Sequence, residues 1–481
     1  QEQVQLQTQL TQFIIYYILI TTTTLISIER TRTMNRVLPQ LPRKFSRRFF
    51  PNHLSSLSLY YHNPNDSRFL STSSTYDSTD STDSTSYLHS HFNPTTEHAQ
   101  LRTLLRSFTQ SQIEPQAHYH NRNESFNRDL FTSLAELGIT TLTVPMENNG
   151  SGMDATAAAI VHEEMSYSDP GFCLSYLAHS ILFVNNLVVN GNDEQRKKWF
   201  VEKEAGTYIG GMGMSEPNAG TDVLGMSTKA VVSDDGRGFV LHGRKMWITN
   251  GTIDGETTGD VFLVYAKTGP NRKDISQFIV EKNREGFVLG QQIKDKLGMR
   301  SSTTAELVFD HVYLPKENLV GEVHHGALCM MRNLEIERVA LAAMAIGIAR
   351  RCIDEMVTYS QQRTAFGKEI HNFGQIQKAI TESYAEYMAG KTYVYAIANG
   401  LDLTSSGNGL DADGVKLYAA KMAKDVADRA IQVMGGYGYV GEYNVERLWR
   451  DAKLLEIGGG TNESHHKNMM RDLVRMGDVL A

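Results

Sequence analysis

Residues 334–349 read LEIERVALAAMAIGIA, and from residue 339 onward this stretch is apolar on every side of a helix. A helix without a polar face has to lie inside the protein, so we predict a buried core helix here. Leu334, Glu337, Leu341, Met344 and Ile348 fall at steps of three and four residues and therefore share one helix face. One acidic side chain, Glu337, thus lies on an apolar stripe where the buried helix begins.

The zone around this helix, residues 322–481, reads as helical throughout, with further long helices at residues 378–400 and 411–434. The preceding zone, residues 206–321, has a different texture. It contains short β-rich runs separated by glycine-bearing turns, which predict an antiparallel sheet or a small barrel. These runs are GFVLHGRKMWI, DVFLVYAKT, SQFIVEK and ELVFDHVYL.

A third zone, residues 96–205, is again helical. Leu101, Leu104 and Leu105 share a helical face, and residues 155–165 and 172–189 add two apolar helical stretches. The order along the chain is therefore helices, strands, helices. Strands do not alternate with helices, which argues against a doubly wound fold and predicts a mostly α protein with a central antiparallel β domain.

The bulk composition is that of a globular protein of two or three domains. The chain has 481 residues, of which 41% are hydrophobic and 21% charged, and its net charge of −7 does not favour nucleic-acid binding. Its three cysteines are Cys173, Cys329 and Cys352, which form no C-x-x-C pair. Neither a disulfide framework nor a cysteine-based zinc site is indicated.

The first 95 residues differ from the rest. Residues 1–33 are interpreted as sequence upstream of the natural start at Met34, although residues 13–28 could also be read as a membrane span. Residues 34–95 begin with a basic, acid-free stretch and include the low-complexity run STSSTYDSTDSTDSTS at 71–86. We interpret them as a mitochondrial transit peptide followed by a linker, with a disordered basic tail as the alternative. No membrane span is expected in the mature protein.

The G-x-G-x-x-G pattern at residues 436–441 is not expected to bind a dinucleotide. Such a fingerprint needs a strand before it, whereas AKMAKDVADRAIQVM, which precedes it here, is helical. The glycines are more simply explained as the end of a helix.

Five segments together carry chemical information. They are MGMSEPNAGTDV at 212–223, WITNG at 247–251, RTAFGKEI at 363–370, QVMGGYGY at 432–439 and LLEIGGGTNES at 454–464. Each alone is ordinary, but in this order they resemble the acyl-CoA dehydrogenase family over residues 96–481. CLSYLAHS from Cys173, KLGMRSS at 296–302 and RDAKLLEIGGGTNES at 450–464 resemble the isovaleryl-CoA dehydrogenase branch.

The resemblance implies a helical bundle, a β-barrel and a four-helix bundle, with FAD as the cofactor. It implies that the residues at 212–221 line the flavin, that those at 247–249 reach its N5, and that Arg363 pairs with the pyrophosphate. It also implies that the residues at 432–436 meet FAD across a subunit interface and that those at 461–463 contact its adenosine half. The full set is Met212, Met214, Ser215, Gly220, Thr221, Trp247, Ile248, Thr249, Arg363, Phe366, Gln432, Gly435, Gly436, Thr461, Asn462 and Glu463.

Two positions depart from the family pattern. The family has Phe-Gln where this chain has Phe373-Gly374, so an FAD contact is in doubt, and Gln375 is expected to point elsewhere. Leu328 stands where the isovaleryl branch has a tyrosine that contacts the substrate, which leaves the acyl specificity open.

The general base is the most informative prediction. Most family members carry a glutamate in the late loop, whereas this chain has Gly459 there. The isovaleryl branch places the glutamate on a core helix before an arginine, which matches Glu337-Arg338. Burial on the apolar stripe would raise the pKa of Glu337, which suits a base that removes a weakly acidic α-proton. The alternative is a structural carboxylate paired with a neighbouring arginine.

Substrate contacts follow from the same resemblance. Arg338 is expected to orient the CoA portion of the thioester, or else to pair with Glu335 or Glu337. Arg272 and Lys273 lie in a loop that resembles the region contacting the CoA phosphates. The predicted substrate-binding set is Thr221, Glu335, Arg338, Gly459, Gly460, Arg272 and Lys273. No metal site is expected, since His465 and His466 have no convergent ligands.

The predicted activity is FAD-dependent dehydrogenation of a short branched acyl-CoA, with isovaleryl-CoA favoured and an electron-transfer flavoprotein as the acceptor. A homotetramer in the mitochondrial matrix is implied by the family. Two alternatives remain open: an acyl-CoA oxidase or flavin monooxygenase on the same scaffold, and a non-catalytic paralogue retained as a scaffold.

Overall fold

The structure is a computed structural model that describes residues 90–203, 205–404 and 407–477. The upstream segment, the candidate span at 13–28, the transit peptide and the linker at 71–86 lie outside the described residues. The described residues all fall within one compact unit in terms of backbone contacts.

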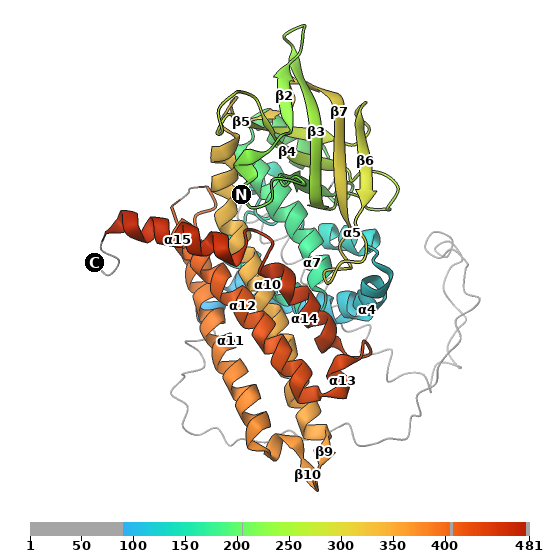
Figure 1. Cartoon of the computed structure of the whole chain (residues 1–481), viewed down its shortest axis with the longest axis vertical. Coiled ribbons are helices and arrows are strands. Elements are labelled where there is room, and N and C mark those ends of the chain that lie inside the picture. The colour runs from blue at the N-terminus through green and yellow to red at the C-terminus, as the bar shows by residue number, and fades with distance from the viewer. Residues whose placement is uncertain (1–89, 204, 405–406, 478–481) are drawn as a thin grey trace, which may run out of the picture. The chain divides into compact units, whose positions relative to one another are not determined.

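The predicted order of helices, strands and helices is confirmed (Figure 1). The first helical zone packs around α6, whose residues are all buried. Its helices are α3 (Thr96–Phe108), η1 (Thr109–Ile113), α4 (Glu114–Asn123), α5 (Arg128–Glu136), η2 (Met146–Asn148), α6 (Ala155–Ser166), α7 (Pro170–Leu177), η3 (Ala178–Asn185), α8 (Asn186–Asn190), α9 (Asp193–Arg196) and η4 (Lys197–Glu202).

Side-chain caps explain where several of these helices begin. Thr95, Asn127, Asp154 and Asp169 precede α3, α5, α6 and α7, and each accepts a hydrogen bond from a backbone N–H in the first turn. Such a cap satisfies a donor that the helix itself cannot pair. The folded unit also begins earlier than the predicted residue 96, because Phe92 is buried against Tyr395.

The middle zone forms one eight-stranded sheet. Seven strands follow the order β6-β7-β3-β2-β4-β5-β8, and the eighth, β1, pairs with β4 off this path. Most neighbours are antiparallel, as predicted, while β1 pairs with β4 in parallel and β2 meets β4 in parallel at one position. The elements are β1 (Gly210–Gly213), η5 (Val223–Gly225), β2 (Lys229–Val232), β3 (Gly238–Thr249), β4 (Val261–Lys267), β5 (Ile275–Glu281), β6 (Phe287–Gln292), β7 (Thr304–Pro315), η6 (Lys316–Asn318) and β8 (Leu319–Val320).

The predicted buried helix is the centre of the last zone. It extends over α10 (Gly326–Gln362), which runs from beside β5 to the short hairpin β9–β10 (Figure 1). The other elements are β9 (Thr364–Ala365), β10 (Lys368–Glu369), η7 (Ile370–Asn372), α11 (Gly374–Gly400), α12 (Gly409–Met434), α13 (Gly436–Tyr439), α14 (Asn444–Leu455) and α15 (Asn462–Met476). The hairpin is a feature that the purely helical prediction for this zone lacked.

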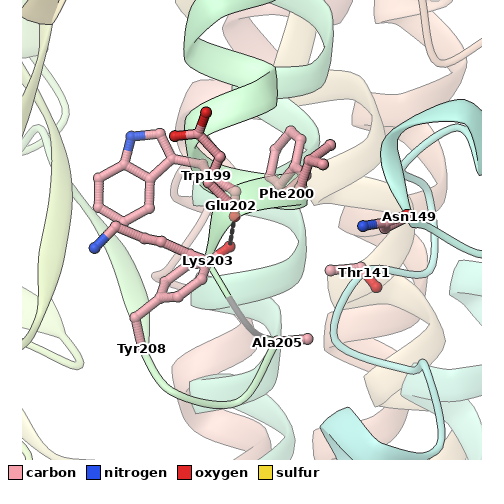
Figure 2. Close-up of a pocket in the computed structure, with 9 residues that line it drawn as sticks. Thr141, Asn149, Trp199, Phe200, Glu202, Lys203, Ala205 and Tyr208 are labelled. Carbon is pink, nitrogen blue, oxygen red and sulfur yellow. Dashed lines mark hydrogen bonds between the residues drawn. The ribbon is translucent and has the colours of Figure 1, made fainter.

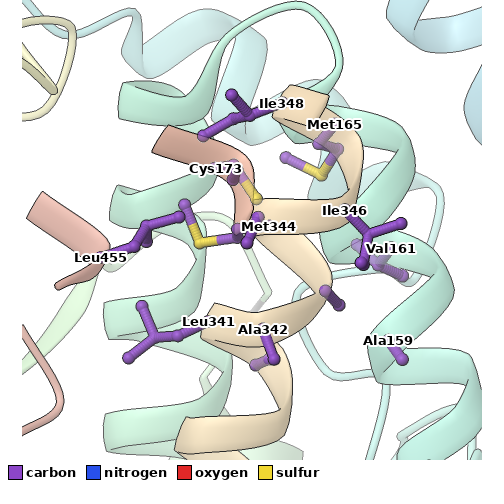
Figure 3. Close-up of a cluster of buried hydrophobic side chains, with 14 of the residues drawn as sticks. Ala159, Val161, Met165, Cys173, Leu341, Ala342, Met344, Ile346, Ile348 and Leu455 are labelled. Carbon is purple, nitrogen blue, oxygen red and sulfur yellow. The ribbon is translucent and has the colours of Figure 1, made fainter. Parts of the chain in front are cut away.

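α10 packs against α6, α11, α12 and α14. Figure 3 shows Met344 and Ile348 of α10 among side chains from α6, α7 and α14. The approach of α10 to α6 requires glycine at residue 347, because a Cβ there would lie 2.2 Å from the carbonyl oxygen of Glu163. The two helical zones therefore share one core.

One segment in the described part of the chain, Pro170–Asn190, is long and apolar enough to cross a membrane by length and composition alone. Its most apolar window is 83% buried inside the fold, which is the behaviour of a core helix.

A buried group of charged side chains crosses the same interface. Glu163 of α6 accepts hydrogen bonds from Arg102 of α3 at 2.8 Å and from Lys391 of α11 at 2.9 Å, while Glu164 pairs with Arg350 of α10 at 2.7 Å. Their charges hold the pKa of Glu163 well below its usual range, although burial acts in the opposite direction. Removing one member would leave the other charges buried and poorly compensated.

We therefore predict that Glu163→Gln destabilises the fold. The free energy of unfolding should fall by about 3–5 kcal/mol, measured from urea denaturation of the holoenzyme. Glu382→Gln is the matched control, because this exposed carboxylate pairs with Lys378 across one helix turn and should change stability by under about 1 kcal/mol. Equal stability of the two variants would contradict a role for the buried group in holding the helical zones together.

Candidate active site

The side chain of Glu337 lies in the first third of α10 and is 6% exposed. Within the described part of the chain, no group donates a hydrogen bond to its carboxylate. Burial raises the pKa of Glu337 to about 7, against the positive charges of Arg338 and Lys416, which act to lower it. The predicted base is therefore a buried carboxylate with a proton affinity near neutral pH.

Gly459 lies directly beside this carboxylate. A Cβ added at Gly459 would lie 3.4 Å from Oε1 of Glu337 and 2.2 Å from Cδ1 of Leu341. Its φ of +65° is also a conformation that side-chain-bearing residues rarely adopt. Residues 337 and 459, the two positions at which a glutamate was considered from the sequence, are thus neighbours in space, and only residue 337 has room for a carboxylate.

The segment at 212–221 continues from β1 and is anchored by a buried lysine. Lys245 of β3 is fully buried, and its ammonium donates to the Met214 carbonyl at 3.0 Å and to Glu216 at 2.9 Å. The Ser215 carbonyl in turn accepts from the Met246 N–H at 2.9 Å. This anchoring holds the predicted flavin-lining segment against the end of β3.

Trp247 is placed by a β-bulge. The register of β3 on β7 shifts between Lys245 and Ile248, and Trp247 has a φ of +67° with 60% of its side chain exposed. A positive φ in a bulky residue is costly, so its retention next to a binding segment is a mark of function. The bulge presents an aromatic face beside the 212–221 segment, while Ile248 is buried and Thr249 ends the strand.

The segment at 212–221 also meets α10. Met212 and Met214 pack against the same apolar cluster as Leu334, and that cluster contains Met330 and Tyr265. The charge of Glu337 acts on the Tyr265 hydroxyl, which contributes to raising the pKa of Tyr265 above its usual range. The structure therefore brings the predicted base and the predicted flavin-lining segment to one place. Gly220 and Thr221 are exposed at the far end of that segment.

A second group of predicted residues lines an open cavity of about 730 Å³ at the end of α10. Arg363, Phe366, Gly435 and Gly436 lie in its wall, whereas Gln432 is exposed in the last turn of α12 and is not part of the wall. The Arg363 guanidinium lies 6.0 Å from the ring centre of Tyr437, and the described residues provide no carboxylate partner for it. An unpaired cation in an open cavity is available for an anionic ligand.

Gln375, which was expected to point elsewhere, is one of the residues that line this cavity. It follows Gly374, the first residue of α11, where an added Cβ would meet nothing within 4 Å. The glycine therefore leaves open space where a side chain would project.

The late predicted residues begin α15. Thr461 is its N-cap and accepts from the Ser464 N–H at 3.3 Å, Asn462 donates its backbone N–H to Glu456, and Glu463 is exposed. His465 is buried against Asp413, and His466 is exposed on the same helix. Among the described residues, one group of side chains is close enough together to hold a metal ion. It consists of His242, Asp310 and His311. All three are exposed, and none was predicted to take part in the site.

The predicted substrate-binding residues divide into two places. Arg272 forms an ion pair with Asp222 at the end of the 212–223 segment, and Lys273 next to it is exposed. Arg338 forms an ion pair with Asp413 of α12 at 3.1 Å, a partner that the sequence did not indicate. Both oxygens of Glu335 accept backbone N–H groups, from Gly407 at 3.0 Å and from Asn408 at 3.1 Å, so this carboxylate holds a loop.

Sequence reasoning missed Lys416 and Asp413 of α12. Lys416 is fully buried and donates to the Gly460 carbonyl at 2.6 Å. A signal existed, because Ala412, Lys416, Ala419 and Ala423 fall at steps of four and three residues. A charged residue on an apolar stripe is the same signal that marked Glu337.

A smaller cavity of about 360 Å³ lies apart from these residues (Figure 2). Trp199, Lys203 and Tyr208 line it, and the Tyr208 hydroxyl donates to the Trp199 carbonyl at 2.8 Å. The Lys203 ammonium lies 4.6 Å from the Trp199 ring centre. None of the predicted site residues takes part in this cavity.

Comparisons with known proteins agree with this arrangement. Three acyl-CoA dehydrogenase domains match in order: the N-terminal domain at residues 95–206, the middle domain at 211–312 and the C-terminal domain at 324–474. The chain is 39% identical over 380 residues to the mitochondrial isovaleryl-CoA dehydrogenase of Solanum tuberosum, which covers 78% of this chain and 90% of that protein.

Solved structures show the same fold. Butyryl-CoA dehydrogenase from Megasphaera elsdenii matches with a TM-score of 0.74 at 33% identity, covering 79% of this chain and 99% of that one. An acyl-CoA dehydrogenase from Bacillus anthracis, complexed with FAD, matches with a TM-score of 0.74 at 28% identity. The match covers 80% of this chain and 68% of that one. The domain matches span nearly all of the described residues, and this chain belongs to the acyl-CoA dehydrogenase family.

Proposed function

We propose that this protein is an FAD-dependent dehydrogenase that forms a double bond between the α- and β-carbons of a short branched acyl-CoA, and that Glu337 removes the α-proton. The observation that carries the proposal is the buried, unpaired Glu337 carboxylate beside Gly459. A structural carboxylate would be expected to have a hydrogen-bonded partner, as Glu335 has in the backbone of Gly407 and Asn408.

The environment of Glu337 fits proton abstraction. Its pKa of about 7 leaves a large fraction ionised near neutral pH, yet makes it a stronger base than an exposed glutamate. Leu341 and the bare Gly459 border the carboxylate, so an acyl chain can approach it without displacing a polar partner. The α-proton would pass to Glu337 as negative charge develops on the thioester oxygen.

That developing charge needs hydrogen-bond donors. Within the described residues, the backbone N–H groups of Gly459 and Gly460 have no acceptor. Gly459 lies beside the Glu337 carboxylate, and Gly460 is the next residue along the chain. They are the donors that we assign to the thioester oxygen. A loop of small residues is suited to this task, because no side chain blocks access to its amides.

The residues at both predicted cofactor regions fit FAD. Trp247 offers an exposed aromatic face beside the 212–221 segment, and Arg363 lies in an open cavity where no described carboxylate pairs with it. FAD held against Trp247, with the residues of the second region reaching it across a subunit interface, would supply the acceptor for the hydride that leaves the β-carbon, and its electrons would then pass to an electron-transfer flavoprotein. Met214, Ser215 and Thr249 complete the contacts that we assign to the flavin end.

Isovaleryl-CoA is the substrate that we favour. A glutamate at residue 459 would fill the wall beside the reacting carbons, and glycine leaves that space for a branch. The likeness to the Solanum tuberosum protein supports this choice. A pocket distinguishes acyl groups that differ by one methylene by only about 1–3 kcal/mol, so related branched chains are expected to react more slowly rather than not at all.

Assembly and location complete the proposal. Phe366 is 97% exposed at a φ of +49°, beside a cavity lined by Phe373, Tyr437 and Val440, and a second copy would cover these apolar groups in a homotetramer. Sedimentation of the holoenzyme as a single chain would exclude this assembly.

The basic, acid-free stretch from Met34 and the mitochondrial relative support the matrix as location. A failed import of a fusion carrying residues 34–95 would contradict this location.

Glu337→Gln should prevent flavin reduction while leaving FAD bound, because the amide keeps the size of the side chain and cannot accept the proton. Anaerobic titration with straight and branched acyl-CoAs, followed by flavin absorbance, should show a loss of at least about 10² to 10⁴-fold in the rate of bleaching. The wild type should bleach fastest with isovaleryl-CoA.

Glu382→Gln, an exposed carboxylate on α11, is the control and should behave as wild type. Normal bleaching of Glu337→Gln would exclude the assignment of the base. A wild type that no acyl-CoA bleaches would favour a non-catalytic scaffold, and rapid reoxidation of the bleached flavin in air would favour an oxidase.

The activity should depend on pH through Glu337. As the pH falls through about 7, the carboxylate takes up a proton and loses its ability to accept one from the substrate. kcat/KM for isovaleryl-CoA should therefore rise with pH, with a midpoint near 7 in the free enzyme. A midpoint near the ordinary glutamate value of about 4.3 would contradict a buried base.

Gly459→Ala should lower kcat/KM for isovaleryl-CoA by at least about tenfold, because the new methyl group meets Leu341 and forces the loop away from Glu337. Leu341→Ala in the same chain should restore part of the loss by making room. Gly477→Ala is the control for backbone strain, since its φ is +72° and nothing lies within 4 Å of an added Cβ. Wild-type kinetics of Gly459→Ala would show that the close approach has no role.

A further inference from the structure

A group of buried charged side chains lies around the glycine-rich loop at 458–460, on the side away from solvent. It brings together α10, α12 and α15, which contribute Arg338, Lys416, Asp413 and His465. None of these groups is consumed by the proposed chemistry. Lys416 is hydrogen-bonded to Gly460, and the preceding residue, Gly459, lies beside Glu337, so the position of this group calls for an explanation.

Lys416 is the most unusual member. Its side chain is fully buried, its ammonium donates to the Gly460 carbonyl at 2.6 Å, and no carboxylate among the described residues comes within ion-pair distance. Burial lowers the pKa of Lys416 to about 8, so it still carries its charge near neutral pH. A buried lysine held by a single carbonyl costs stability, and a methionine of similar length would not.

The neighbouring charges show which group the ammonium faces. Glu337 is the strongest of the acidic groups that favour the charged form of Lys416, ahead of Asp413 and Glu456, while Arg338 opposes it. In return, Lys416 and Arg338 are the charges that favour the ionised form of Glu337. The carboxylate of Glu337 and the ammonium of Lys416 thus act on each other without a direct hydrogen bond.

Arg338 and His465 share Asp413 as a partner. Arg338 pairs with Asp413 at 3.1 Å, and Nδ1 of His465 is hydrogen-bonded to the same carboxylate. Burial lowers the pKa of His465, so near neutral pH it is a neutral partner. His465 also supports the loop, since a Cβ at Gly460 would lie 3.0 Å from its Cε1. Lys416 differs from Arg338 in that the described residues give it no carboxylate partner at ion-pair distance.

We propose that Lys416 is a positioning residue for the Glu337 carboxylate: its ammonium holds the Gly460 carbonyl, and with it the Gly459 backbone, against Glu337, and its charge stabilises the ionised, proton-accepting form. The proposal rests on the assignment of Glu337 as base. It gives two separable effects, one on the geometry of the loop and one on the proton affinity of Glu337.

Two substitutions separate these effects. Lys416→Gln keeps a donor for the Gly460 carbonyl and removes the charge, whereas Lys416→Met removes both. In each, the protonation midpoint of Glu337 should move upward by about one pH unit or more, because an opposite charge nearby has been lost. Lys416→Met should also lower kcat below that of Lys416→Gln, by about tenfold, because the loop is no longer held.

The midpoint is measured in two ways on the holoenzyme. Infrared absorption of the protonated carboxyl, taken as the difference from Glu337→Gln at each pH, reports Glu337 without any need for turnover. The pH profile of kcat/KM reports the same group during catalysis. Lys421→Met is the matched control, because this exposed lysine on α12 pairs with Asp425 and should leave both midpoints unchanged.

An infrared midpoint that stays at the wild-type pH in Lys416→Gln and Lys416→Met would overturn the proposal. If Lys416→Met does not fold, Lys416→Arg provides the second test: it keeps the charge and must keep the wild-type midpoint, and a shift as large as that of Lys416→Gln would overturn the proposal. A wild type that no acyl-CoA bleaches would instead refute the proposed function, while the infrared midpoint would still decide the role of Lys416.

Discussion

A buried carboxylate to which no described residue donates a hydrogen bond is costly, and this protein keeps one in the first third of its longest described helix. Glu337 lies on the apolar stripe of α10, where loss of water raises its affinity for a proton. The charges of Arg338 and Lys416 keep that rise moderate, so the group remains partly ionised near neutral pH. The balance between burial and these two charges determines whether Glu337 can act as a base.

The rest of the fold holds other groups around this carboxylate. The close approach of α10 to α6 at Gly347 places α10 in the core, and the buried Lys245 fixes the 212–221 segment at the end of β3. Trp247 is turned outward by a bulge in the same strand. Each part is rigid because a buried charge or a close backbone contact fixes it, which suits a reaction that depends on alignment.

Local patterns in the sequence were sufficient for the order of the zones, the buried helix and the position of Glu337 on its stripe. They did not give the parallel pairing of β1 with β4, since strand direction depends on contacts distant in sequence. The partners of Arg338 and Glu335 lie on α12 and in the loop before it, which periodicity within α10 could not reveal. Lys416 carried a readable signal, a charge on an apolar stripe, that gains meaning only once the loop at 458–460 is seen beside it.

The central claim is that one mid-chain carboxylate reaches the α-carbon of the substrate. The most direct measurement is a structure of the holoenzyme with a non-oxidisable isovaleryl-CoA analogue. The account predicts an oxygen of Glu337 within about 3.5 Å of the α-carbon, with Gly459 against the acyl chain. An α-carbon that faces another acidic group, with both oxygens of Glu337 beyond about 5 Å, would contradict it.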